Sequence, residues 1–523
     1  MEAAMNRSIC LWLALLGCGN APGADSDPDA RGDGDAAIDP DAGSDAGPIS
    51  SLQTFVTYLG GDAFEQARDV TVDGQGNIIV VGGTQSANFP TTAGAYDTTF
   101  DTSAGGQLGG GGRMDVFVTK FSPTGALLWS TFIGGPSYDR AYGVEVDAAG
   151  DIYIAGRAGV GFPTTAGVLQ PTFGGDVAAN GLYGPQDGFV AKLSTDGTTL
   201  LWSTYFGGDD RDFIRDLDLD STGIYVGVGE LTRPHPYVTP GAFDTTRSSG
   251  YDVVVAKLAL DGTSVQWATY FGGSGVDGVP SVRSGPNHTV YLIGSTTSTD
   301  LPTTAGAHQT GKAANEDFYV AKFTAAGDAL VYCTYVGGNG IESHETHHGV
   351  VDSAGQVILG FYTQSSDLPT TAGAISASRT GVADAYVVKL AADGGSLVAA
   401  TYLGGNAGED VQGLAVDASG RIYVGGSSQS SDLPVTAGSF QATSGGSGES
   451  FVAWLSPDLT TVEYLTYLGG SGSEAQRSLW IDAGGNAISV GQTTSPSIGT
   501  TAGAVQMTYG GMTDSYVGAF KLH

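Results

Sequence analysis

Thr57-Tyr58-Leu59-Gly60-Gly61 is the stretch that decides the fold, because close variants of it return six more times along the chain. The later copies begin at Thr131, Thr204, Thr269, Thr334, Thr401 and Thr466. The steps between successive copies are 74, 73, 65, 65, 67 and 65 residues. A nearly constant period of this kind is typical of repeat architectures, in which each repeat is one supersecondary unit.

The copy that begins at Thr401 indicates what one repeat contains. Gly404-Gly405 ends a strand and permits backbone conformations that other residues avoid. Asp417-Ala418-Ser419-Gly420 is a tight hairpin turn between two short apolar stretches. The four expected strands are residues 413–416, 422–425, 449–455 and 462–467. Four short antiparallel strands in about 65 residues is the content of one propeller blade.

The two ends of the repeat region predict a closed ring. Residues 52–58 match the fourth strand of a repeat, whereas residues 514–522 at the other end match a third strand. The N-terminal segment would therefore complete the last blade and leave no open sheet edge at the junction. The predicted fold is all-β: a seven-bladed β-propeller over residues 51–523, with four antiparallel strands per blade.

Four sequence elements recur in order within this region. They are Thr-Tyr-Leu-Gly-Gly, Asp-x-x-Gly-x-Ile-Tyr-Val-x-Gly, Leu-Pro-Thr-Thr-Ala-Gly and Asp-x-Phe-Val-x-Lys-Leu. Together they resemble the bacterial β-propeller repeat family often labelled SBBP. The resemblance implies the propeller fold and an exported bacterial protein, and it implies no general enzymatic activity.

Composition and charge narrow the classes of partner. Gly makes up 84 of the 523 residues and hydrophobic residues make up 41%, which suits a turn-dense β-protein with a real core. The formal charge of −33 would repel a phosphate backbone, so nucleic acid is not an expected partner. Charged residues are only 14% of the chain, so most of the surface should be polar and uncharged.

Residues 1–17 have the pattern of a lipoprotein signal peptide. Arg7 precedes a short apolar run that is too short to cross a bilayer as a mature helix. The run ends in Leu15-Leu16-Gly17-Cys18, which resembles the lipobox of bacterial lipoproteins, in which the Cys carries the lipid. An ordinary signal peptide with a chance cysteine is the alternative. We expect an exported lipoprotein of the outer membrane or cell surface, attached to the membrane only through Cys18.

Residues 18–50 predict a disordered acidic tether. They are mainly Ala, Gly, Pro and Asp, with no aromatic residue. Such a composition cannot bury enough apolar surface to repay the entropy of folding.

An acidic residue stands four positions after the second Gly of every copy. The seven residues are Glu65, Asp139, Asp212, Asp277, Glu342, Glu409 and Glu474. In a propeller this turn lies near the central axis, so the carboxylates would form an acidic ring. The ring would bind cations or a cationic partner. Alternatively, each carboxylate accepts backbone N–H groups of its own Gly-Gly turn, which is the usual kind of role for a residue that every blade requires.

Two further features repeat in the third strand. That strand opens with an acid in every copy, at Asp115, Asp187, Asp252, Asp317, Asp384, Glu449 and Asp514. Five of the seven Lys residues share one register, at Lys120, Lys192, Lys257, Lys322 and Lys389. A partly covered Lys needs an acidic partner, so we predict a repeated ion pair with the hairpin Asp or the ring acid. A solvated Lys on the rim is the alternative. The fourth copy has Gly285 in place of the hairpin Asp.

The fifth copy departs most from the repeat. Its turn carries three of the seven His residues and is two residues longer than the corresponding turn of the sixth copy. Clustered His and Glu side chains suit a divalent cation, zinc or calcium, and the candidate metal ligands are Glu342, His344, His347 and His348. A polar rim loop without metal is the alternative.

Two long loops, residues 95–114 and 168–186, interrupt the first and second copies. They contain Tyr96, Phe100, Phe173 and Tyr183. Aromatic side chains among Gly, Asn and Asp suit the binding of a glycan or a peptide. The alternative is that they pack locally and cover the face on which the ring turns lie.

The sequence favours non-catalytic binding at the bacterial cell envelope. We find no Ser-His-Asp pattern, phosphate-binding loop or dinucleotide fingerprint, so no enzyme is expected and no cofactor is certain. The expected role is that of a monomeric scaffold that binds a protein or peptide through one propeller face. A glycan-binding module and a metal-dependent hydrolase or lyase at the fifth-copy His cluster are the alternatives, because propellers host all of these functions.

Overall fold

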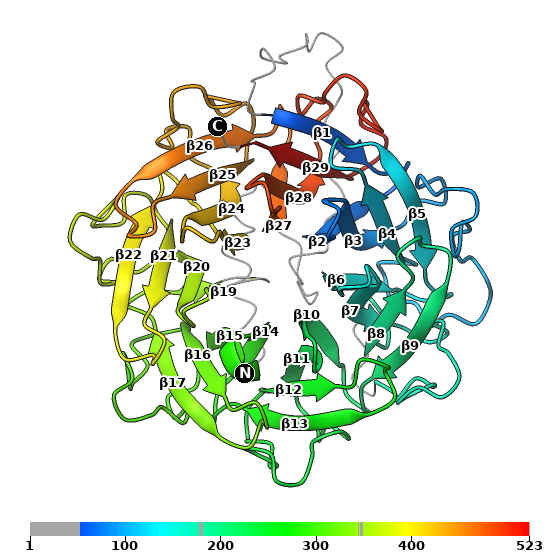
Figure 1. Ribbon diagram of the computed structural model, residues 1–523, viewed down its shortest axis with the longest axis horizontal. Helices are drawn as coiled ribbons and strands as arrows, with labels where there is room; N and C mark the ends of the chain where they lie inside the picture. The colour runs from blue at the N-terminus through cyan, green and yellow to red at the C-terminus, as the bar shows by residue number, and fades with distance from the viewer. Residues whose placement is uncertain (1–52, 177–180, 344, 346–348, 522–523) are drawn as a thin grey trace.

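The computed structural model describes residues 53–176, 181–343, 345 and 349–521, which form a ring of seven β-sheets around a common axis (Figure 1). The predicted seven-bladed propeller with four antiparallel strands per blade is confirmed. In the fifth blade the inner strand is split into two short pieces. The described residues contain one 3₁₀ turn, η1 Pro286–His288, which replaces the hairpin Asp turn of the fourth blade.

Each blade runs from an inner strand at the axis to an outer strand at the rim. The inner strands are β2 Glu65–Val72, β6 Arg140–Val146, β10 Phe213–Asp220, β14 Asp277–Ser284, β18 Glu342–Ser343 with β19 Gly349–Val351, β23 Gly413–Val416 and β27 Glu474–Ile481. The second strands are β3 Ile78–Thr84, β7 Ile152–Ala158, β11 Gly223–Leu231, β15 Val290–Thr296, β20 Val357–Thr363, β24 Ile422–Ser428 and β28 Ala487–Thr493. The third strands are β4 Asp115–Phe121, β8 Asp187–Leu193, β12 Asp252–Leu258, β16 Asp317–Phe323, β21 Asp384–Leu390, β25 Glu449–Leu455 and β29 Asp514–Phe520. The outer strands are β5 Leu127–Ile133, β9 Leu200–Phe206, β13 Val265–Phe271, β17 Leu330–Val336, β22 Leu397–Leu403, β26 Val462–Leu468 and β1 Gln53–Leu59.

The N-terminal strand closes the ring, as predicted. β1 pairs antiparallel with β29, and their sheet has the order β1-β29-β28-β27. Blade 7 is therefore built from both ends of the described chain, which lie side by side at the rim in Figure 1. The hydrogen bond from Thr501 N–H to the Val56 carbonyl, 3.0 Å, adds a further link across this junction.

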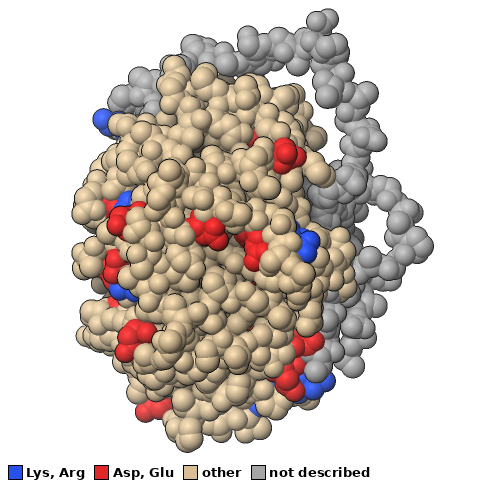
Figure 2. Space-filling view, turned by 90° about the vertical axis from the view of Figure 1, so that its right-hand side faces the viewer, with Lys and Arg blue, Asp and Glu red and all other residues tan. Residues whose placement is uncertain are grey.

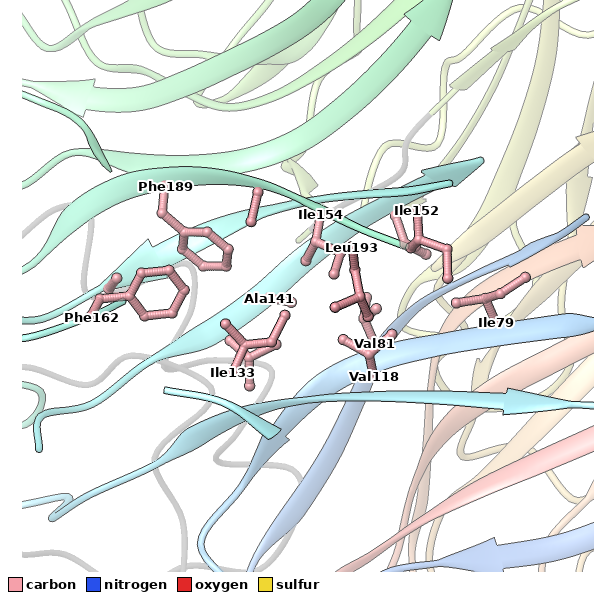
Figure 3. Close-up of a cluster of buried hydrophobic side chains, with 14 of the residues drawn as sticks. Ile79, Val81, Val118, Ile133, Ala141, Ile152, Ile154, Phe162, Phe189 and Leu193 are labelled. Atoms are coloured by element: carbon pink, nitrogen blue, oxygen red, sulfur yellow. The ribbon is translucent and has the colours of Figure 1, made fainter. Parts of the chain in front are cut away.

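Seven of the eight clusters of buried hydrophobic residues lie between neighbouring blades, one at each junction, and a small eighth cluster consists of Met114, Tyr138 and Tyr183. Between blades 1 and 2, for example, Ile79, Val81 and Val118 pack against Ile152 and Ile154 (Figure 3). The other six junctions are filled in the same way. Because both faces of every blade are covered, the third strands are buried along nearly their whole length. This explains why they read as nearly continuous apolar runs instead of alternating patterns.

The outer strands are edges, and each of the six that follow a tight turn carries a β-bulge. In β5 the pairing register shifts between Lys120 and Phe121, which leaves Leu128 unpaired with an exposed side chain. Bulges of this kind disrupt an edge that could otherwise pair with another chain. The rim in Figure 2 is mainly uncharged, with separate acidic and basic side chains, as the composition predicted.

The predicted signal peptide, the lipidation residue Cys18 and the acidic tether lie outside the described residues, so these remain predictions. Among the described segments, no helix has the length and hydrophobicity that a bilayer crossing requires.

Candidate functional site

The seven residues of the predicted acidic ring are buried beneath the Gly-Gly turns. Their exposed fractions are 2% or less. Each carboxylate accepts the backbone N–H of the second Gly of its own turn, over distances of 2.6–3.1 Å. These residues are Glu65, Asp139, Asp212, Asp277, Glu342, Glu409 and Glu474. The geometry is that of the structural alternative, and the carboxylates are not presented to a cation or partner outside the fold.

A second carboxylate stands beside each ring acid. It belongs to the acid that opens the third strand of the preceding blade, and it accepts backbone N–H groups of the loop before that strand. The first Gly of the turn lies between the two groups. A Cβ atom on Gly404 would stand 2.5 Å from Glu409 Oε2 and 2.7 Å from Asp384 Cγ. The first glycine is therefore required for space, because no side chain fits between the two acids. We call each such couple a junction pair.

Burial dominates the electrostatics of the junction pairs. It raises the pKa of Glu65 to about 7 and that of Asp115 to about 8, and the neighbouring carboxyl of the pair adds to each rise. Burial likewise raises the pKa of Glu449 to about 7, followed by repulsion from Glu474. Glu65, Asp115 and Glu449 therefore hold protons at pH values where exposed carboxyls are ionised.

The predicted Lys ion pair is present where the hairpin Asp is available. Lys120 Nζ lies 2.9 Å from Asp73, and Lys389 Nζ lies 3.1 Å from Asp352. Lys192 Nζ lies 3.0 Å from both Asp147 and Asp151. The partner is the hairpin Asp and not the ring acid.

Two blades replace the ion pair with other contacts. Lys257 donates to Thr222 Oγ1 over 2.6 Å, because Asp220 of that hairpin binds His288 and Tyr225. In blade 4 the hairpin Asp is missing, and Lys322 lies 4.7 Å from the ring centroid of Tyr291. A cation–π contact thus takes the place of the missing carboxylate.

The aromatic residues of the long loops pack inward. Tyr183 is buried, with its ring centroid 4.7 Å from that of Tyr138. Tyr96, Phe100 and Phe173 are partly buried against the interblade cores. The two loops also bind each other, through the hydrogen bonds from Gly110 N–H to the Gly181 carbonyl and from Gly111 N–H to the Leu182 carbonyl. The two loops therefore form a cover, in which Tyr183 is buried and Tyr96, Phe100 and Phe173 remain partly exposed, and the binding role of these rings stays a prediction.

The structure describes only one of the four candidate metal ligands. Glu342 is buried as a ring acid, whereas His344, His347 and His348 lie outside the described residues. Within the described part of the chain, His, Cys, Asp and Glu form no group of three that could hold a metal ion. The metal site and the enzyme alternative that depends on it remain untested predictions.

Sequence reasoning missed a group of arginines at the axis. Arg68, Arg140, Arg157 and Arg215 have their guanidinium carbons 4.5, 4.9, 5.5 and 5.5 Å from the ring centroid of Tyr142. The guanidinium carbons of Arg157, Arg211 and Arg215 lie 4.8, 5.0 and 5.4 Å from the ring centroid of Phe213. We call Arg68, Arg140, Arg157, Arg211, Arg215 and Arg477, with the rings of Tyr138, Tyr142, Tyr183 and Phe213, the axial arginine cluster.

Glu345 brings a carboxylate to this cluster from the other side of the ring. It accepts from Arg68 Nη2 over 2.6 Å and from Arg477 Nη1. Gln66 Oε1 accepts from Arg68 and Arg140, over 3.2 and 2.9 Å. The fifth-blade turn that the sequence singled out for its extra length therefore supplies an acid that crosses the axis to blades 1 and 7.

A signal for the cluster exists in the sequence. Arg68, Arg215, Glu345 and Arg477 each stand three residues after a ring acid, and Arg140 stands one residue after. In the structure the register of β2, β10 and β27 skips the arginine at this place, which is therefore a bulge residue. A bulge re-aims a side chain, so aligned repeats would have revealed the shared position.

The face that bears the Gly-Gly turns also carries the loops between second and third strands. Five parallel bridges, such as that between Met114 and Tyr138, join these loops to the following turns. We call this the turn face. Four exposed large apolar side chains lie in its loops: Leu108, Val382, Met507 and Met512, with exposed fractions of 41–59%. The four others in the described residues lie on outer strands at the rim, at Leu128, Leu201, Val331 and Val398.

Comparison with known proteins agrees with this repeat architecture. Residues 400–434 match the SBBP beta-propeller repeat. The matched stretch runs from the outer strand of blade 5 through the first hairpin of blade 6. Variants of the Thr-Tyr-Leu-Gly-Gly element occur in all seven copies, whereas the hairpin Asp is absent from blade 4.

A curated relative and two solved structures are similar to this chain. The regulatory protein FlaEY of Caulobacter vibrioides is 24% identical over 398 residues, which cover 73% of this chain and 39% of the relative. This chain thus spans well under half the length of that relative. The WD40 β-propeller domain of Doa1 has a TM-score of 0.43 at 11% identity, covering 90% of this chain and 97% of that one. A polysaccharide (ulvan) lyase has a TM-score of 0.42 at 11% identity, covering 84% and 93%.

Proposed function

We propose that this protein is a non-catalytic binding protein of the bacterial cell envelope, which holds a protein or peptide partner on its turn face. The observation that carries the proposal is the distribution of exposed apolar side chains. Leu108, Val382, Met507 and Met512 project from loops of the turn face, and large apolar groups in exposed loops suit a contact surface. The opposite face is formed by the hairpins of the first two strands and by the turns between third and fourth strands. Among the described residues it carries no exposed large apolar side chain.

The build of the two faces supports the same assignment. The loops of the turn face vary in length from blade to blade, whereas the opposite face repeats short turns such as Asp73–Asn77. Variable loops on a rigid scaffold are where binding residues concentrate. We favour a protein or peptide partner over a glycan, because Tyr183 is buried and the other three long-loop rings are only partly exposed. Attachment through Cys18 would keep the propeller at the envelope.

Capture of partners from a native envelope extract tests the proposal. The full chain, the Met507→Glu/Met512→Glu variant and the Leu201→Glu control are used as baits. Leu201 is a rim residue of similar exposure, 43%. We expect the turn-face variant to lose the bands that the wild type and control capture. Equal capture by all three baits, or loss through the rim change alone, would remove the turn face as the binding surface.

A further inference from the structure

Every blade anchors the loop between its second and third strands with one buried side chain. In six blades this anchor is apolar and at most 5% exposed, at Phe89, Phe162, Leu301, Leu368, Leu433 and Ile498. In blade 3 the anchor is His235. The N–H of His235 donates to Tyr270 Oη over 2.6 Å, as the N–H of Leu301 donates to Tyr335 Oη over 2.9 Å in blade 4. One of the seven anchors therefore carries a group that can take up a proton.

The imidazole of His235 is buried without the partners that a polar group needs. Its side chain has no exposed surface, and neither ring nitrogen has a hydrogen-bond partner among the described residues. Its neighbours are aromatic, with the ring centroids of Phe206 and Tyr237 at 4.9 and 5.8 Å. A buried imidazolium would lose its hydration and gain no hydrogen bond in return, so burial lowers the pKa of His235 to about 3.

The nearest carboxyl does not supply a counter-charge at neutral pH. Asp212 Oδ1 lies 3.9 Å from His235 Nε2. Burial raises the pKa of Asp212 to about 8, and it raises that of Asp187, the junction-pair partner of Asp212, to about 8 as well. Both carboxyls therefore hold protons as the pH falls below 7, and neither balances a positive charge on the imidazole.

The other titratable and charged groups around the anchor leave this result unchanged. Asp210 accepts the backbone N–H groups of Thr232 and Arg233 at the start of the loop. Burial raises the pKa values of Tyr237 and Tyr270, so both phenols are uncharged. Further charged groups stand nearby at Asp176, Asp209, Arg247 and Asp252. None of these groups shifts the pKa of His235, which burial alone lowers.

The blade 3 loop also has fewer bonds at its anchor and open space beside it. In blade 4, Tyr335 Oη donates to the Ser298 carbonyl over 3.0 Å, whereas Tyr270 donates to no carbonyl within the described part of the chain. A solvent-open pocket of about 530 Å³ adjoins the anchor, and Pro234, His235 and Val238 contribute to its wall. A displaced imidazole can therefore reach water without the rearrangement of neighbouring blades.

We propose that His235 makes the blade 3 loop, residues 232–251, an acid-sensitive element of the turn face that is closed at neutral pH and opens in acid. When the loop opens, the imidazole reaches water and takes up a proton with the ordinary histidine pKa of about 6.5. It must lose that proton to return to its buried place, so acid holds the loop open. Opening separates His235 and Tyr237 from Phe206 and uncovers part of the apolar junction between blades 2 and 3. The element operates whether or not a partner is bound.

Proton linkage gives the size and sign of the effect. The pKa of His235 is lower in the closed loop, about 3, than in the open loop, about 6.5. The closed form thus binds fewer protons, so its advantage is complete above pH 6.5 and is lost as pH falls toward 3. Between pH 7 and pH 5 the ratio of open to closed loop should rise about 25-fold.

Hydrogen exchange of the full chain, followed by mass spectrometry at pH 7 and pH 5, tests the proposal. The informative amides are those of His235 and Thr239, which donate to Tyr270 Oη and the Ala268 carbonyl. The matched amides of blade 4 are those of Leu301 and Thr304. After correction for the intrinsic pH dependence of exchange, protection in the blade 3 loop should fall about 25-fold from pH 7 to pH 5. Protection in the blade 4 loop should stay constant.

Two variants assign the effect to His235. His235→Leu restores the anchor that blades 4, 5 and 6 have, and His235→Gln keeps a polar side chain that does not titrate in this range. Both should show the same protection of the blade 3 loop at pH 7 and pH 5. The proposal is overturned if the wild-type loops of blades 3 and 4 respond equally to pH, or if either variant retains the fall in protection.

Discussion

Replacing the first glycine of a repeat by alanine should destabilise the propeller far more than the small change in volume suggests. In Gly404→Ala the new Cβ would stand 2.5 Å from Glu409 Oε2 and 2.7 Å from Asp384 Cγ, so one carboxyl must move by about 1 Å to reach an ordinary contact. Glu409 Oε2 accepts the Gly405 N–H over 2.9 Å, and that movement breaks the bond. Overpacking costs about 1–3 kcal/mol and the lost hydrogen bond about 1–3 kcal/mol. We expect a total of about 2–6 kcal/mol.

Gly408→Ala is the matched control in the same turn. The nearest atom to its Cβ would be Gln429 Oε1 at 3.8 Å, an ordinary contact. Urea unfolding of the full chain, followed by circular dichroism, gives the midpoint for each variant. Gly408→Ala should unfold within about 0.5 kcal/mol of the wild type. Equal midpoints for the two variants would refute the reasoning, because they would mean that the junction pair shifts aside at no cost.

Three other predictions follow from buried groups. His235 occupies the place that Leu301 holds in blade 4, both ring nitrogens lack a hydrogen-bond partner among the described residues, and burial lowers its pKa to about 3. His235→Leu should therefore raise the free energy of unfolding by about 1–3 kcal/mol, which a higher urea midpoint would show. The variant should also lack the loss of stability that the wild type shows as pH falls from 6.5 toward 3. A lower midpoint for the variant would mean that the imidazole of His235 makes a hydrogen bond. Lys120→Met leaves the buried Asp73 without its cation and should lower the free energy of unfolding by about 2–4 kcal/mol. Lys322→Met loses only a cation–π contact worth about 1 kcal/mol. Urea unfolding of both variants checks this order, and a larger loss of stability in Lys322→Met than in Lys120→Met would contradict it. Burial raises the pKa values of Glu65, Asp115 and Glu449 to about 7–8, so the folded state binds more protons than the unfolded state between the two sets of pKa values. Stability should therefore fall as pH rises from about 4, where the unfolded carboxyls ionise, to about 8. Glu449→Gln should make this fall shallower, and an unchanged pH slope would show that Glu449 is ionised throughout.

The repeat and its strands were predictable from the sequence because they depend on short-range patterns. The Gly-Gly breaks, hairpin Asp turns and apolar runs fall within about 65 residues, and the strands expected at residues 413–416 and 449–455 match β23 and β25. The Lys ion pair was also predictable, because a partly buried Lys requires a partner and the hairpin Asp recurs beside it. Gly285 marked in advance the blade in which that partner would be missing.

The roles of the ring acids could be predicted only in part from the sequence. Seven acids at one place indicated a shared function, but the choice between a cation-binding ring and a bonded turn depended on burial. The pairing of each ring acid with an acid of the preceding blade was not foreseen. Members of such a pair are 24 or 25 residues apart in sequence, or meet across the two ends of the chain, as Glu65 and Asp514 do.

The sequence by itself determined the number of blades, their strand content and the closure by β1, since each follows from periodicity and turn chemistry that act over a few residues. Tertiary structure alone decided which side chains meet at the axis. Arg68 and Glu345 are 277 positions apart and lie in blades 1 and 5, yet their side chains are 2.6 Å apart. The physical reason is ring closure: it places every inner strand around one axis, where bulges at the same repeat position direct side chains from distant blades toward a common point.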